Sequence, residues 1–96
     1  MKNYTGMYII RPTLTDEGFQ AVIKTINELF ENHGGRITEV DEWGIRELAY
    51  EIDDFKEGYY VDLEFESDSN EALLEYDRVC NIKDSIIRHI VVKLPR

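Results

Sequence analysis

The sequence predicts a single α+β domain, spanning residues 1–96, in which strands and helices follow in the order βαββαβ. Apolar and polar residues alternate over 47–52 and 59–66, as is typical of two strands joined by a turn. Two other segments, 19–30 and 73–80, carry apolar residues three and four positions apart, as amphipathic helices do. At 96 residues the chain is long enough for one core and too short for two ordinary domains.

The first strand is predicted at residues 4–11, which are rich in strand formers, and Pro12 ends it because proline lacks an amide hydrogen. Thr15 is the expected N-cap of the first helix. One apolar stripe runs along this helix: Phe19, Val22, Ile23, Ile26, Leu29 and Phe30. The Gly34 and Gly35 pair should end it.

The second strand is predicted from about Arg36 to Ile52 and should contain an irregularity. Three of its apolar residues are spaced three apart, namely Ile37, Val40 and Trp43. They cannot all point to the same side of a regular strand, so we expect a bulge at 41–44. Residues 53–58 should form the hairpin loop, and the third strand should follow to about Glu66.

Asp68 followed by Glu71 predicts a capping box at the start of the second helix. This helix carries the stripe Leu73, Tyr76, Val79 and Cys80. The lone Cys80 is interpreted as a small core residue rather than a nucleophile. Residues 86–94 are rich in β-branched side chains and should form the last strand.

This order predicts a ferredoxin-like fold, with a four-stranded antiparallel sheet and two helices on one face. The opposite face of the sheet would stay open. Function is therefore expected on that face or on the sheet edges.

The chain is acidic, with a formal net charge of −9 from 20 acidic and 11 basic residues. Taken whole, it repels a phosphate backbone, so RNA binding requires locally gathered cations or a strongly basic partner. Neither a signal peptide nor a stretch of roughly 20 apolar residues is recognised, which favours a cytoplasmic protein with no membrane partner.

No catalytic residue, metal site or cofactor is predicted. His33 and His89 are not at metal-ligand spacing from each other or from Cys80, and both are interpreted as structural. Glu64 and Glu66 share a strand face and could share a proton, but exposed carboxylates of this kind are usually just solvated.

An RNA recognition motif has the same element order and stacks bases on aromatic residues of its third strand. Here Glu57 stands where that motif has a basic residue, and Tyr60 shares its face with carboxylates. Base stacking on the sheet is therefore disfavoured.

The run W-G-I-R-E-L-A-Y-E-I at 43–52 and the run I-R-H-I-V-V-K at 87–93 resemble the bacterial small-subunit ribosomal protein six family, as do Tyr4, residues 7–9 and Arg11 with Pro12. The resemblance implies a non-catalytic structural component of the small ribosomal subunit. It also implies cooperative binding to 16S rRNA with small-subunit ribosomal protein eighteen, a small basic partner. The alternative is a non-ribosomal ferredoxin-like interaction module that uses the sheet for self-association.

Carried over residue by residue, the resemblance implies RNA contacts at four cations: Lys2, Arg46, Arg88 and Lys93. Arginine binds phosphate oxygens with two parallel hydrogen bonds, whereas lysine acts as a point charge. A second interpretation of Arg46 is an ion pair with a carboxylate such as Glu64.

Ile45 and Glu47 flank Arg46 and leave less positive charge there than many relatives have. We therefore expect heavy dependence on the basic partner, whose cations would meet Glu47, Glu51, Asp62, Glu64 and Glu66.

Overall fold

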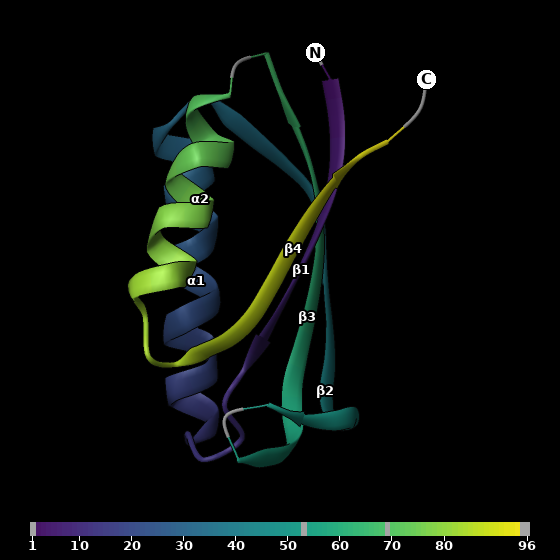
Figure 1. Cartoon of the computed structure of the whole chain (residues 1–96). Helices are drawn as coiled ribbons and strands as arrows, with labels where there is room; N and C mark the ends of the chain where they lie inside the picture. The colour runs from purple at the N-terminus through teal and green to yellow at the C-terminus, as the bar shows by residue number, and fades with distance from the viewer. Residues whose placement is uncertain (1, 53, 69, 95–96) are drawn as a thin grey trace.

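The computed structural model describes residues 2–52, 54–68 and 70–94, and its elements follow the predicted order. They are β1 (Lys2–Ile10), α1 (Asp16–Asn32), β2 (Gly35–Ile52), β3 (Phe55–Ser67), α2 (Glu71–Ile82) and β4 (Ile86–Lys93). Within the described residues the four strands form one antiparallel sheet in the order β2-β3-β1-β4. Both helices pack on the same face of this sheet, as Figure 1 shows. The predicted fold class is confirmed.

The core lies between the helices and the inward side chains of the two central strands. Alternate residues of β1 and β3 point toward the helices and are buried: Tyr4, Tyr8, Ile10, Val61, Leu63 and Phe65. All six residues of the predicted α1 stripe are buried against them. The Phe30 ring centroid lies 4.2 Å from that of Phe65 and 5.3 Å from that of Tyr76, so three elements meet at one aromatic cluster.

The two helices begin differently. Thr15 caps α1 as predicted, since its Oγ1 accepts a hydrogen bond from the Gly18 amide at 3.1 Å. The capping box predicted at Asp68 and Glu71 is wrong. Helical hydrogen bonding starts later, with the Leu74 amide donating to the Asn70 carbonyl at 2.9 Å, and the Asn70 side chain makes no capping hydrogen bond.

The irregularity predicted in β2 is present. The register between β2 and β3 shifts between Glu42 and Gly44, and Gly44 has φ +82°, a conformation that a residue without Cβ adopts at little cost. Two further shifts, at Ile37/Glu39 and Glu47/Ile52, were not predicted. Each shift changes which β2 residues face which β3 residues.

The hairpin turn between β2 and β3 is shorter than predicted. The expected loop covered 53–58, but β3 already begins at Phe55. Asp54 turns the chain with φ +69°, while Asp53 lies outside the described residues. The short turn lets the two strands continue as a long hairpin. We call its end, residues 47–52 and 55–58, the hairpin arm.

This hairpin arm lies close against β1 on the open face. A Cβ on Gly58 would stand 2.3 Å from Ile9 Cγ2 and 3.6 Å from Leu48 Cδ2, so only glycine fits there without a shift. Ile9 is consequently 7% exposed although no helix covers its side of the sheet. The guanidinium carbon of Arg88 lies 5.8 Å from the Tyr50 ring centroid, which brings the hairpin arm close to β4 as well.

Candidate functional site

The open face of the sheet changes character from β2 to β4. Three consecutive rows of residues cross it, in register: Glu39, Glu64, Thr5 and Val92; then Asp41, Asp62, Met7 and Ile90; then Gly44, Tyr60, Ile9 and Arg88. We call Glu39, Asp41, Asp62 and Glu64 the acidic half of this face. We call Met7, Ile9, Ile90 and Val92 its apolar half.

In the acidic half, carboxylates stand directly opposite each other across β2 and β3. Glu39 faces Glu64, and Asp41 faces Asp62. Like charges in this position destabilise a strand pair. A hydrogen bond shared with Glu39, together with desolvation and nearby negative charge, raises the pKa of Glu64. The acidic half is therefore a place where added positive charge would relieve repulsion.

The predicted partner residues fall in two places. Asp62, Glu64 and Glu66 share the open face of β3, as the alternation predicted. The main cause of the raised pKa of Glu64 is its neighbour Glu39, whereas the sequence suggested Glu66 as the carboxylate that could share a proton with it. Glu39 and Asp41 were missed as site residues.

The other two predicted partner residues, Glu47 and Glu51, are exposed and lie on the hairpin arm. They line a separate hollow of about 410 Å³ there, together with Leu48, Tyr50, Lys56 and Glu57. They do not join the acidic half of the open face.

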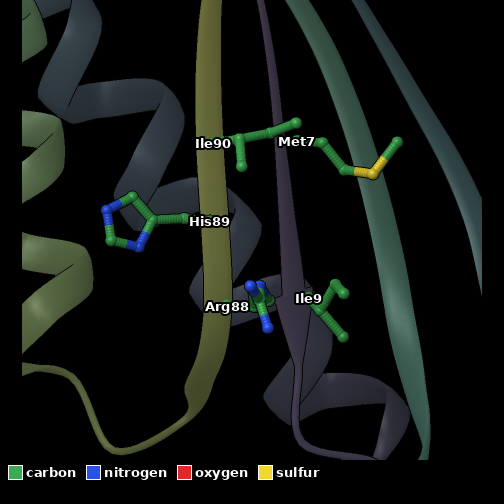
Figure 2. A pocket seen from close by; sticks show the side chains of 5 residues that line it. All are labelled: Met7, Ile9, Arg88, His89 and Ile90. Carbon is green, nitrogen blue, oxygen red and sulfur yellow. The ribbon is translucent and has the colours of Figure 1, made fainter. Parts of the chain in front are cut away.

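The apolar half contains a hollow of about 180 Å³ lined by Met7, Ile9, Arg88, His89 and Ile90. Figure 2 shows Met7, Ile9 and Ile90 pointing away from the helices, whereas His89 points toward them. Ile90 is 53% exposed and Val92 52% exposed, which is unusual for adjacent positions on one strand face. The sequence analysis placed Ile90 and Val92 in the last strand and in the run that carries the resemblance, but not among the site residues.

His89 serves the packing of β4 on α2. Its Nε2 lies 2.9 Å from Asp77 Oδ1, and its ring meets the Tyr76 ring edge-on at 5.6 Å. His33 likewise places its Nδ1 2.8 Å from the Leu29 carbonyl oxygen at the end of α1. Each histidine thus has a partner in the fold.

The four predicted RNA-contacting cations lie at opposite ends of the sheet. Lys2 pairs with Ser67, and Lys93 with Tyr4, at the end where β1 begins. Arg46 and Arg88 lie toward the hairpin end, on the two edge strands. The structure does not gather the four cations into one cluster.

Arg46 is exposed and faces Gly58, and its Nε donates a hydrogen bond to the Trp43 carbonyl at 3.3 Å. In the described part of the chain it forms no ion pair with Glu64, which stands three rows away opposite Glu39. The ion-pair interpretation of Arg46 is therefore wrong. Its guanidinium remains available to an external anion.

The Trp43 and Tyr60 rings stack with centroids 6.0 Å apart at an interplanar angle of 6°. The Trp43 indole nitrogen donates to Asp41 Oδ2 at 3.1 Å, so a carboxylate is fixed beside the stacked pair. This arrangement disfavours a nucleobase on the same rings.

Among the described residues, no group of three or more histidine, cysteine or acidic side chains is arranged to hold a metal ion. Cys80 is buried, and its burial raises the pKa of the thiol to about 12. In the same described ranges, no helix combines the length and apolar character needed to cross a bilayer.

The comparisons with known proteins agree with this architecture. The family model described as "Ribosomal protein S6" matches residues 3–93. The crystal structure of 30S ribosomal protein S6 from Thermotoga maritima superposes with a TM-score of 0.93 at 29% identity, covering 97% of this chain and 87% of that one. The Arabidopsis thaliana protein At3g17210 gives a TM-score of 0.55 at 14% identity, with 100% and 95% covered, a likeness in fold alone.

Proposed function

Because the chain belongs to the ribosomal protein S6 family, we propose that it is a structural component of the small ribosomal subunit that binds 16S rRNA cooperatively with small-subunit ribosomal protein eighteen. The match over residues 3–93 is the observation that carries this proposal. The protein would act in the cytoplasm on the ribosome, without catalysis, cofactor or small-molecule substrate.

The charge distribution supports a cooperative mode of binding. The carboxylates of the acidic half repel phosphate and attract a basic protein. The RNA contacts proposed for this chain lie at the two ends of the sheet, away from that repulsion: Lys2, Arg46, Arg88 and Lys93. Most of the attraction to RNA would then come from the cations of the partner.

Sedimentation of cell extract tests the ribosomal assignment. The protein should travel with the small subunit, because a structural component remains bound through the gradient. A pool that is wholly free of ribosomes would contradict the proposal. If that free pool were self-associated, the alternative of a non-ribosomal interaction module would be favoured, with exposed Ile90 and Val92 as its contact.

Titration of labelled 16S rRNA tests cooperativity. The isolated protein should bind weakly, and protein eighteen should raise its affinity at least about tenfold, which corresponds to roughly 1.4 kcal/mol of coupling free energy. The physical reason is that the partner supplies the positive charge that this chain, at −9, lacks. Equal affinities with and without the partner would contradict cooperative binding.

A further inference from the structure

We infer that Arg11 and Arg88 together bind backbone phosphates of RNA at the hairpin end of the sheet, where aromatic rings of the hairpin arm hold both guanidinium groups in place. The inference rests on the proposed function. It adds Arg11, which is not among the four RNA contacts predicted from the sequence, and it gives Arg88 a neighbour with which to act. We call these two residues the arginine pair.

The sheet brings the arginine pair together on its open face. Figure 2 shows Arg88 beside Ile9, its register partner on β1. Ile10 is buried toward the helices, so the residues on either side of it, Ile9 and Arg11, lie on the opposite side. The Arg11 amide donates to the Ser85 carbonyl at 2.8 Å, which keeps the chain extended beside β4. With Arg11 two residues beyond Ile9 and one strand away from Arg88, the two Cα atoms stand roughly 8 Å apart, a distance across which arginine side chains can meet one phosphate.

Each guanidinium of the pair lies over a ring of the hairpin arm. The guanidinium carbon of Arg11 is 5.3 Å from the Phe55 ring centroid, and that of Arg88 is 5.8 Å from the Tyr50 ring centroid. Both distances are within the range of a cation–π interaction. Such a contact positions a guanidinium without occupying its N–H groups as a carboxylate would. An arginine held in this way loses less side-chain freedom when it binds an anion.

The charges of the pair are not neutralised within the described part of the chain. No ion pair joins Arg11 or Arg88 to a described carboxylate, although the sequence has 20 acidic and 11 basic residues. The Nε of Arg11 is buried and has no hydrogen-bond partner among the described residues. Two like charges this close repel each other, so an anion that contacts both lowers their energy. Phosphate oxygens suit this role because they accept two parallel hydrogen bonds from one guanidinium.

The surroundings of the pair indicate how an RNA strand would approach. The hairpin arm carries carboxylates that line a hollow with Lys56, namely Glu47, Glu51 and Glu57. They would repel a strand laid across the arm. The edge strand β4 has no acidic residue and carries Arg88 and Lys93, about 17 Å apart at the usual rise of a strand. A strand of RNA, charged at every nucleotide, can follow this edge and place one phosphate at the arginine pair.

Titration of labelled 16S rRNA with the complex of this protein and protein eighteen, at several salt concentrations, tests the inference. Arg11→Ala removes the charge, whereas Arg11→Lys keeps the charge without the planar guanidinium. Phe55→Leu removes the ring and leaves both arginines in the chain. Arg78→Ala is the matched control, because Arg78 is exposed on α2 and pairs with Glu75. Thermal unfolding verifies that each variant is folded.

We expect Arg11→Ala to weaken RNA binding about tenfold and to reduce the slope of log affinity against log salt by about 0.7 to 0.9, the contribution of one phosphate. Arg11→Lys should keep the slope and recover only part of the affinity. Phe55→Leu should weaken binding by a smaller factor with the slope unchanged, since no charge is lost. Arg78→Ala should match the unchanged protein in affinity and slope.

The outcomes separate this inference from the proposed function. If the unchanged complex does not bind the RNA, the proposed function is overturned. If it binds and Arg11→Ala keeps both affinity and slope, the arginine pair alone is overturned. A loss of association between Arg11→Ala and protein eighteen without RNA would also overturn it, in favour of carboxylates of a protein. Inorganic phosphate at constant ionic strength should not displace the RNA, and displacement would overturn the inference in favour of free phosphate.

Discussion

Some residues on the open face are exposed and can contribute to binding, whereas others are buried and contribute to the stability of the fold. Arg46 is exposed, and its Nε donates a hydrogen bond to the carbonyl of Trp43, three positions earlier. Ile9, on the same face, is almost fully covered and contributes to the packing of the hairpin arm. Substitutions at these two kinds of position should therefore differ in what they change.

Arg46→Ala should lower the affinity of the ternary complex with RNA and protein eighteen by about 1 to 2 kcal/mol, in the range of a charge-assisted contact. The free energy of unfolding should hardly change, because Arg46 is exposed. Arg46→Lys should recover part of the loss, since it keeps the charge without the planar guanidinium. A fall in stability with unchanged affinity would show that Arg46 acts within the fold.

Cys80 should make the protein less stable at alkaline pH. Burial raises its pKa to about 12 in the folded state, whereas an unfolded thiol titrates near 8.5. The unfolded chain therefore releases this proton first, so the contribution is complete below about pH 8.5 and is lost as pH rises toward 12. Urea unfolding between pH 8 and 10 should show a shallower decline for Cys80→Ala. Rapid alkylation of native Cys80 at pH 8 would contradict its burial.

At the scale of elements, the helix starts offer a matched comparison. Thr15→Ala removes the side-chain hydrogen bond to the Gly18 amide and should lower the free energy of unfolding by about 1 kcal/mol. Asn70→Ala should cost much less, because Asn70 occupies the N-cap of α2 without a capping side-chain bond. Urea denaturation of both variants measures the difference. Equal losses would mean that the cap hydrogen bond of Thr15 contributes nothing.

The elements themselves could be predicted because their signals are local. The six apolar positions of α1 repeat with the helical period. The bulge at 41–44 was predicted from the spacing of Ile37, Val40 and Trp43. The other two shifts in β2 were missed because they belong to its pairing with β3, which the spacing of residues within β2 does not reveal. The capping box failed because α2 begins at Glu71 with Asn70, not Asp68, at its N-cap, a boundary that a motif of four residues does not determine.

At the scale of the whole molecule, the candidate site could be predicted only where the alternation of side chains along a single strand was sufficient to place the residues. Asp62 and Glu64 share a face by simple alternation, and the structure agrees. Glu39 and Asp41 join them only after the register shifts of β2 are counted. Ile90 was missed because an apolar strand residue is usually buried, and its exposure follows from the position of β4 at the sheet edge with no helix over that face.

The salt dependence of RNA binding should reflect the two separate ends of the sheet. Replacing Lys2, Arg46, Arg88 and Lys93 together by alanine should reduce the slope of log affinity against log salt by at most about 3.6, at about 0.9 for each neutralised phosphate. One double alanine variant replaces Lys2 and Lys93, and the other replaces Arg46 and Arg88. Their reductions in slope should add up to the reduction of the fourfold variant. Lys24→Ala on α1 serves as the control and should leave the slope unchanged.

The position of β1 in the sheet also shapes how a growing chain can fold. Its residues pair on one side with 59–67 and on the other with 86–93, both far along the sequence. During translation β1 is made first. The backbone groups on both its edges therefore stay unpaired until β3, and then β4, have left the exit tunnel. Such distant pairings form slowly compared with a helix, and an unpaired edge can recruit a neighbouring nascent chain. The interval before β4 arrives is thus when the β1 edge is most open to pairing with another chain.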